Sequence, residues 1–146
     1  MSSNEAFVIE RTYPVTVDRV WNAITHPEEM KLWYFDLPDF KPEVGVEFQF
    51  MGGPSADRQY KHLCKITEVI TGKKIAHSWR YEGYTGETLV TFQLFDEDAQ
   101  TRLKLTHEGL ETFPPDNPDL AKENFAEGWI LIIGTSLKEY LKKTVH

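Results

Sequence analysis

The sequence predicts an α+β protein in which a curved antiparallel sheet of about six strands wraps around one long C-terminal helix, with two short helices after the first strand. Between residues 44 and 107, apolar residues recur mainly at every second position, which is typical of strands with one buried face. From residue 118 onward the spacing changes to three and four residues, which is typical of an amphipathic helix. That helix must cover the sheet, because no other segment is long enough.

The N-terminal part is predicted to contain one strand and two short helices. Residues 6–13 combine β-branched and aromatic side chains, and Pro14 ends the strand because it has no N–H to donate. Thr16 is placed to cap a first helix. Pro27 closes that helix and opens a second one, since proline is well tolerated at a first helical position. An aromatic-rich run at residues 32–35 follows.

The middle of the chain is predicted to form a meander of antiparallel strands. The alternating segments are residues 44–50, 60–70, 75–81, 88–95 and 101–107. Thr71-Gly72, Glu82-Gly83 and the acidic run 96–98 supply turn chemistry between them. Longer irregular stretches are expected at residues 34–43, 52–58 and 109–117.

The C-terminal segment is predicted to be a helix of about 25 residues, capped by Asp116 or Asn117 and beginning at Pro118. At about 1.5 Å per residue it extends roughly 38 Å and crosses several strands. A strongly twisted sheet cannot contact such a helix along its whole length. A cavity between helix and sheet is therefore expected.

Length, charge and cysteine content exclude several classes of protein. With 146 residues, the chain is expected to form a single domain over residues 1–146. A net charge of -7 and scattered basic residues predict no nucleic-acid partner. Cys64 is the only cysteine, so no internal disulfide can form. Without a signal-peptide pattern or a long apolar run, we expect a cytoplasmic protein that is not inserted in a membrane.

Several motifs together resemble one known family. They are Ile9-Glu10-Arg11, Pro14, Val20 through Ile24, Pro27-Glu28, Lys31 through Tyr34, Gly45 with Phe48, Ser78-Trp79, Thr88 through Phe92, Thr101 through His107 and Gly128-Trp129. The chain resembles the START-like, or SRPBCC, superfamily and, within it, proteins homologous to the activator of heat shock protein 90 ATPase. This resemblance implies a helix-grip fold with a cavity for lipids, polyketides or other apolar molecules. It also suggests contact with a chaperone, although no segment corresponds to the additional N-terminal domain that chaperone activators carry.

Aromatic residues form 13% of the chain, and they are the residue type expected around an apolar pocket with a few polar tips. The predicted cavity walls are Trp33, Phe48, Phe50, Trp79, Tyr81, Phe92, Phe125, Trp129 and Ile133. The predicted polar tips are His62, His77 and His107.

The three histidines leave alternatives open. Half-buried imidazoles usually find structural partners, whereas acid/base catalysis and metal binding are the other interpretations. No His-x-His or His-Glu-x-x-His spacing supports a metal site, so neither a metal nor a cofactor is expected. Cys64 is expected to be a small buried side chain. No residue is assigned a catalytic role.

Three functions are consistent with these patterns. The leading hypothesis is a noncatalytic protein that binds a small hydrophobic molecule in the cavity. The second is an enzyme that uses the cavity for acid/base cyclase or hydrolase chemistry through His77 or His107. The third is a chaperone-interacting or stress-response module. Exposed edge strands would also allow a homodimer.

Overall fold

The computed structural model describes residues 6–34, 37, 39–55, 57–114 and 116–143. Its strands are β1 (Phe7–Tyr13), β2 (Glu47–Ser55), β3 (Arg58–Ile70), β4 (Lys74–Tyr81), β5 (Thr88–Glu97) and β6 (Gln100–Glu108). Two helices, α1 (Val17–Thr25) and α2 (Pro27–Trp33), follow β1. After β6 come the 3₁₀ turns η2 (Leu110–Thr112) and η3 (Pro118–Leu120), and then the helical segments α3 (Lys122–Leu131), η4 (Ile132–Ser136) and α4 (Leu137–Lys143).

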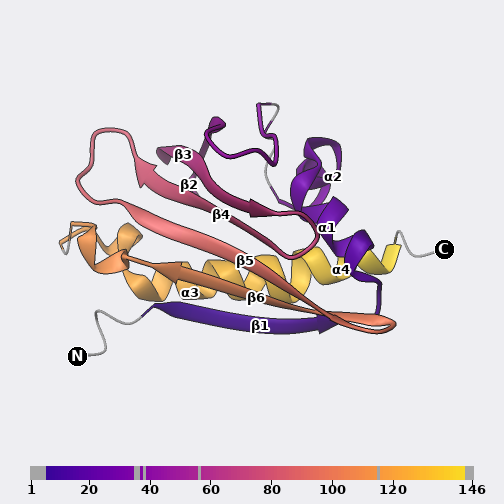
Figure 1. The fold of residues 1–146 in the computed structure, drawn as a ribbon. Helices are drawn as coiled ribbons and strands as arrows, with labels where there is room; N and C mark the ends of the chain where they lie inside the picture. Colours follow the sequence, from indigo (N-terminus) through magenta and orange to yellow (C-terminus); the bar gives the residue numbers. More distant parts are fainter. Residues whose placement is uncertain (1–5, 35–36, 38, 56, 115, 144–146) are drawn as a thin grey trace.

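The six strands form one antiparallel sheet in the order β1-β6-β5-β4-β3-β2. The long helix runs along one face of this sheet, as Figure 1 shows. The inward side chains of the central strands, such as Val90, Leu103 and Leu105, are completely buried between the two layers. This arrangement confirms the predicted α+β helix-grip fold.

The long helix begins at Lys122, so the predicted start at Pro118 is wrong. Ala121 has an extended backbone, with ψ of 150°, which separates the η3 turn from α3. The Asn117 side chain accepts a hydrogen bond from the Asp119 backbone N–H at 3.0 Å and thereby stabilises a local turn instead of a continuous helix. In the middle of the helix, η4 is a π-helical turn, and its Ile133 carbonyl accepts a hydrogen bond of 2.6 Å from the buried Tyr13 hydroxyl.

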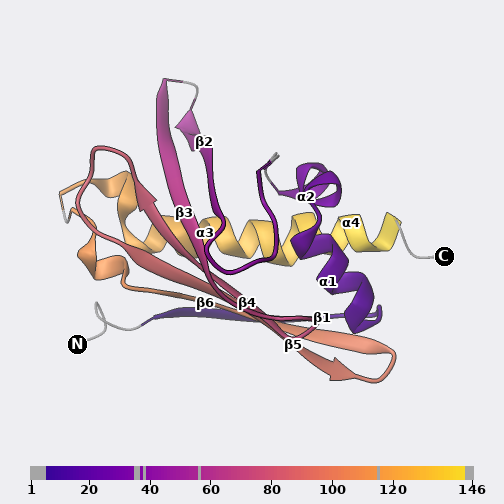
Figure 2. The same cartoon turned by 45° about the horizontal axis from the view of Figure 1, so that its top comes forward.

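The predicted irregular stretch at 52–58 is largely strand. β2 continues to Ser55 and β3 starts at Arg58, so the two form a long hairpin that extends beyond the rest of the sheet (Figure 2). Alternation stops being visible at Gly52-Gly53-Pro54, which is why the sequence pattern missed this continuation. Proline is tolerated there because β2 lies at the edge of the sheet.

The helices α1 and α2 close one end of the helix–sheet interface. The Trp33 indole N–H donates to the Ala23 carbonyl at 2.9 Å and fastens α2 onto α1. Glu29 on α2 accepts hydrogen bonds from Arg19 on α1 and from Tyr140 on α4, both at 2.7 Å. This end of the interface therefore has a third layer that the opposite end, next to η3, does not share (Figure 1).

Candidate functional site

A cleft of about 580 Å³, open to solvent, lies between the sheet and the first half of the long helix. The sheet contributes Gly52, Tyr60, His62, Trp79 and Tyr81. The helical side contributes Asp119, Leu120, Asn124, Phe125, Glu127, Gly128, Trp129, Leu131 and Ile132. We call this cleft the mouth pocket. Its volume lies within the usual range for sites that bind small molecules.

Helix periodicity explains which residues of α3 reach the mouth pocket. Asn124, Phe125, Gly128 and Leu131 of α3, with Ile132 at the start of η4, are separated by the three- and four-residue steps that place side chains on one helix face. Leu131, which lines the cleft, is 60% exposed. The pocket thus presents apolar surface to solvent.

The rim of the mouth pocket is polar. The Tyr60 hydroxyl donates to Asp119 Oδ2 at 2.8 Å and accepts from the Asn117 amide at 3.4 Å. These bonds join β3 to η3 and to the residue just before it, across the entrance. Burial is the largest cause of the raised pKa of Tyr60, and Asp119 adds to the shift.

Trp79 is the centre of an aromatic cluster behind the rim. Its ring lies 5.0 Å from His62, 5.6 Å from His107, and 5.7 Å from both Phe50 and Trp129, measured between centroids. The Trp79 indole N–H donates to the Tyr81 hydroxyl at 2.9 Å, so its polar atom is satisfied inside the protein. These contacts fix the orientation of the sheet wall.

His62 is a neutral polar group in that wall. Its Nδ1 donates to the Tyr60 carbonyl at 3.0 Å, and its ring stacks on Phe50 at 4.2 Å. Burial lowers the pKa of His62 to about 4, and hydrogen bonds to the backbone of Tyr60 and Phe50 only partly oppose this shift. The side chain therefore carries no charge at neutral pH.

His107 is fully committed to structural hydrogen bonds. The Trp129 indole can only donate, so its 3.0 Å bond makes His107 Nδ1 an acceptor and places the proton on Nε2. Nε2 then donates to Thr88 Oγ1 at 2.8 Å, and Thr88 donates to the Trp79 carbonyl at 2.8 Å. Burial and the neighbouring His77 lower the pKa of His107 to about 3. Neither ring nitrogen is available for acid/base chemistry in this arrangement.

His77 lies farther inside, beside a void of only about 10 Å³. The residues around this inner void are Ile24, Met30, Trp33, Tyr34, Leu37, Phe40, Phe48, Ile75, His77 and Phe92. His77 Nδ1 donates to the Ser78 carbonyl at 2.9 Å, and burial lowers the pKa of His77 to about 4. A void of this size is near the lower limit for a single water molecule. The space between α2 and the sheet is therefore filled by side chains.

The predicted site residues fall into three groups. His62, Trp79, Tyr81, Phe125 and Trp129 line the mouth pocket. Trp33, Phe48, His77 and Phe92 surround the inner void. Phe50, His107 and Ile133 lie in the buried core next to these cavities.

Sequence reasoning missed the rim residues Tyr60, Asp119 and Asn124. Tyr60 stands two positions before His62 on β3, so strand alternation places it on the same face and could have indicated it. The position of Asp119 depends on the turn at Ala121, which has no periodic signal. Asn124 is polar, and the apolar pattern of the helix therefore excluded it.

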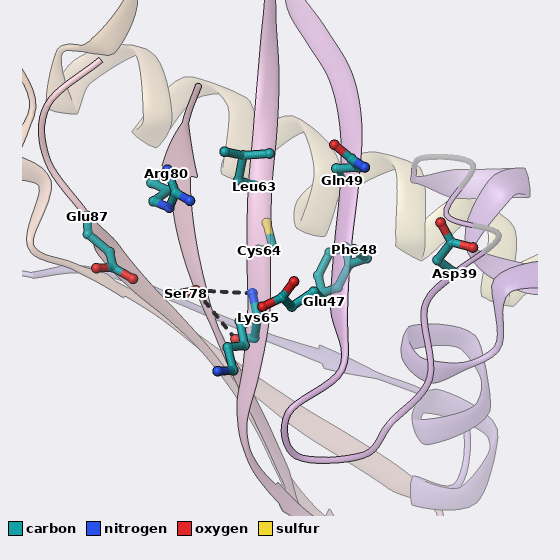
Figure 3. A pocket seen from close by; sticks show the side chains of 10 residues that line it. All are labelled: Asp39, Glu47, Phe48, Gln49, Leu63, Cys64, Lys65, Ser78, Arg80 and Glu87. Atoms are coloured by element: carbon teal, nitrogen blue, oxygen red, sulfur yellow. Dashed lines mark hydrogen bonds between the residues drawn. The ribbon is translucent and has the colours of Figure 1, made fainter. Parts of the chain in front are cut away.

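A second groove, of about 350 Å³, lies on the outer face of β2, β3 and β4 (Figure 3). Its side chains are mostly charged or polar, including Glu47, Lys65, Arg80 and Glu87. Here the Ser78 hydroxyl bonds to both the N–H and the carbonyl of Lys65, at 3.1 and 3.5 Å. A side chain thus supplies a connection between β3 and β4. The charged lining makes this groove less suited to an apolar ligand than the mouth pocket.

The described residues offer neither a metal site nor a membrane-spanning helix. They contain no group of three or more His, Cys, Asp or Glu side chains arranged to hold a metal ion. In the same part of the chain, no helix has both the length and the apolar character that a membrane crossing needs. Cys64 is buried, and burial raises the pKa of its thiol, which disfavours the reactive thiolate.

Residues 14–142 match the family described as Activator of Hsp90 ATPase homolog 1-like protein, abbreviated AHSA1. The chain belongs to this family. The matched residues extend from the end of β1 to α4, so every residue of the AHSA1 mouth pocket lies within them. A comparison with curated proteins finds no match.

Solved structures share the AHSA1 fold of this chain. Mll3558 from Rhizobium loti has a TM-score of 0.80 and 22% identity, covering 93% of this chain and 96% of its own. CalU16 from Micromonospora echinospora has a TM-score of 0.73 and 23% identity, covering 93% and 75%. DynU16, from the dynemicin biosynthetic locus, has a TM-score of 0.75 and 20% identity, covering 94% of this chain and 47% of its own. At these identities the likeness establishes the fold alone.

Proposed function

We propose that this AHSA1-family protein binds a small apolar molecule in the mouth pocket. The observation that carries the proposal is an open cleft of about 580 Å³ whose two walls are aromatic, with Trp79 and Tyr81 on the sheet and Phe125 and Trp129 on the helix. Covering this surface with a ligand would remove apolar area from water, at roughly 25 cal/mol per Å².

The polar groups of the pocket support an apolar ligand with a small hydrogen-bonding end. His62 is neutral at neutral pH because burial lowers its pKa to about 4, so it adds no charge to the wall. Tyr60, Asp119 and Asn124 lie at the rim, where they can orient a polar end while the aromatic walls hold the rest. This distribution matches a site in which shape and burial supply affinity and a few polar atoms supply orientation.

Lipids and aromatic natural products are the first ligand classes to test. The helix-grip fold is shared with DynU16, which is described as a protein of the dynemicin biosynthetic locus. The resemblance of the sequence to the SRPBCC superfamily implies a cavity for lipids, polyketides or other apolar molecules, and it supports including polyketide-like compounds beside lipids. Native mass spectrometry of the purified protein, before and after incubation with such a library, would reveal both retained and added ligands.

Gly128 offers a direct test of the site. It faces the mouth pocket, and a Cβ built there meets no atom within 4 Å, so a larger side chain fits without a clash at its first atom. Gly128→Leu should fill the pocket and weaken binding of N-phenyl-1-naphthylamine, a neutral fluorescent probe, at least tenfold. Gly128→Ala is the matched control, because it adds only one methyl group. Both replacements should stabilise the helix by roughly 0.5–1 kcal/mol.

Equal probe binding by Gly128→Leu, Gly128→Ala and the unaltered protein would contradict the proposal. Equal loss of probe binding in both variants would show that the probe binds near Gly128, but not that the volume of the pocket limits its binding. The proposal therefore predicts a larger loss of affinity for Gly128→Leu than for Gly128→Ala. Because both substitutions favour the helix, reduced binding cannot be attributed to unfolding, and thermal denaturation checks this directly.

Contact with a chaperone, pairing of two copies and a cytoplasmic location stay predictions. A pull-down with a 90-kDa chaperone and sedimentation of the purified protein would test the first two. The enzyme hypothesis is weakened for His107, because both of its ring nitrogens are hydrogen-bonded to other side chains.

A further inference from the structure

We infer that Trp129, held in place by His107, sets the size of the molecule that the mouth pocket accepts by separating it from the inner void. This inference rests on the proposed function and deepens it. It predicts compact ligands, such as molecules of a few rings or short chains, in preference to long acyl chains.

Trp129 stands between the two cavities. The mouth pocket and the inner void have no lining residue in common among the described residues. The Trp129 ring lies 5.7 Å from Trp79, which lines the mouth pocket. The same ring also lies 6.3 Å from Tyr34 and 6.1 Å from Phe92, which both surround the inner void. Together with Trp79, whose ring lies 6.1 Å from His77 at the inner void, the Trp129 indole therefore separates the open pocket from the closed one.

Directional hydrogen bonds hold this partition. Trp129 is only 3% exposed, and its N–H donates to His107 Nδ1 at 3.0 Å. Thr88 fixes the other side of the His107 ring at 2.8 Å, and the Trp79 carbonyl in turn fixes Thr88. Turning the indole away would leave a buried acceptor on His107 without its donor, which is unfavourable. The partition is thus held by hydrogen bonds within the protein, and these bonds form without any contact to a ligand.

The inner void is lined by apolar side chains that could border a longer cavity, but it contains almost no free space. Trp33, Tyr34, Phe48 and Phe92 border the inner void of about 10 Å³. Replacing the Trp129 indole by a small side chain would add its volume to this void and connect it with the mouth pocket. A ligand too long for the unaltered pocket would then be able to extend inward.

Primary alcohols of increasing chain length test the inference, with displacement of N-phenyl-1-naphthylamine as the readout. Each methylene that becomes buried should raise affinity about fourfold. In the unaltered protein this increase should stop at the chain length that reaches Trp129. In Trp129→Ala the increase should continue for about three further carbons. Trp129→Leu, which removes less volume, should shift the limit in the same direction by less.

Phe125→Ala is the control, because Phe125 lines the mouth pocket. Among the described residues its ring contacts are with His107 and Phe113, and none is with a residue of the inner void. It should weaken all alcohols by a similar factor and leave the limiting chain length unchanged. Circular dichroism identifies variants that fail to fold.

A measurement on the unaltered protein covers the case in which both Trp129 variants fail to fold. In NMR spectra, decanol should shift the indole N–H signals of Trp79 and Trp129 and leave that of Trp33 in place. An equal shift at Trp33, or an unchanged length limit in a folded Trp129 variant, would overturn the inference while the proposed function stands. Failure of every alcohol and of the probe to bind the unaltered protein would instead overturn the proposed function.

Discussion

The two ends of the helix–sheet interface are built from the same helix and the same sheet, yet one is filled and the other is open. At the end covered by α1 and α2, side chains such as Met30, Trp33 and Leu37 leave a void of about 10 Å³. At the end beside η3, a cleft of about 580 Å³ remains. The difference shows that a helix-grip fold does not by itself determine a cavity. A third layer, formed by the segments after β1, decides where space is left.

The side-chain hydrogen bonds between elements also differ between the two ends. At the filled end, Arg19 and Tyr140 both bond to Glu29 and connect α1, α2 and α4. At the open end, the Tyr60 hydroxyl on β3 bonds to Asp119 in η3 and to Asn117 just before η3. We therefore expect the filled end to dominate stability and the open end to dominate binding.

The largest effect is expected from acid. In the folded protein the pKa values of His62 and His77 are about 4, and that of His107 is about 3, whereas an unfolded histidine titrates near 6.5. Below about pH 6.5 the unfolded chain therefore binds protons that the folded protein does not. The stability contribution is complete above pH 6.5 and is lost as the pH falls toward 4, by up to about 1.4 kcal/mol per pH unit for each histidine.

Urea denaturation at pH 7, 6, 5 and 4.5 measures this loss. His77→Gln, at the filled end, and His62→Gln, at the open end, should each make the free energy of unfolding depend less on pH. The control is His26→Gln, because His26 is exposed on the surface. A stability that does not change between pH 7 and 4.5 would contradict the neutral buried state of these imidazoles.

The next largest effect separates the two ends directly. Trp33→Ala should lower the free energy of unfolding by roughly 3–5 kcal/mol, because it creates a cavity at the filled end and removes the bond to the Ala23 carbonyl. Phe125→Ala at the open end should cost about 1–2 kcal/mol, since Phe125 is only half-buried. Denaturant titrations of the two variants provide the comparison. Equal losses would show that the third layer has no special importance for stability.

A smaller effect is expected at the rim. Tyr60→Phe removes the hydroxyl that donates to Asp119 and should lower the free energy of unfolding by about 1 kcal/mol or less. The same replacement should clearly change the rate at which a ligand leaves, because the bond spans the entrance. Stopped-flow release of N-phenyl-1-naphthylamine should be faster in this variant. Tyr84→Phe on the exposed surface is the control, and matching release rates for the two would refute a closing role for Tyr60.

The smallest effect is local to the β3–β4 pairing. Ser78→Ala removes the side-chain link to the Lys65 backbone and should accelerate hydrogen exchange at the Lys65 amide about fivefold, as expected for a loss of about 1 kcal/mol. Thr67→Val, which removes a hydroxyl bonded to the Ala76 carbonyl nearer the filled end, is the matched control. It should leave exchange at Lys65 unchanged. If both variants accelerate that amide equally, the effect is not specific to Ser78.

Local patterns predicted the element order because strand alternation and helix periodicity reflect which face of each element is buried. They placed β4 and β5 within two residues of their observed bounds. They failed at Gly52-Gly53-Pro54, where alternation stops although the strand continues, and at Ala121, where one extended residue delays the helix.

The candidate site was harder to predict than the fold. Aromatic residues such as Trp79 and Trp129 were identified because their types suit both a core and a pocket. Which of them face open space depends on how the third layer fills the interface, and that is a property of packed volumes and not of sequence period. This explains why Trp33 and Phe92 surround a nearly filled void, whereas Tyr60 and Asp119, which no apolar pattern marks, form the rim.

The most direct test is to locate a bound apolar ligand by intermolecular NOEs. We predict contacts from the ligand to Tyr81, Phe125 and Trp129 in the mouth pocket and none to Leu63 or Arg80 in the outer groove. Contacts only to Leu63 and Arg80, or none to the aromatic walls at saturating ligand, would contradict the assignment of the mouth pocket as the binding site.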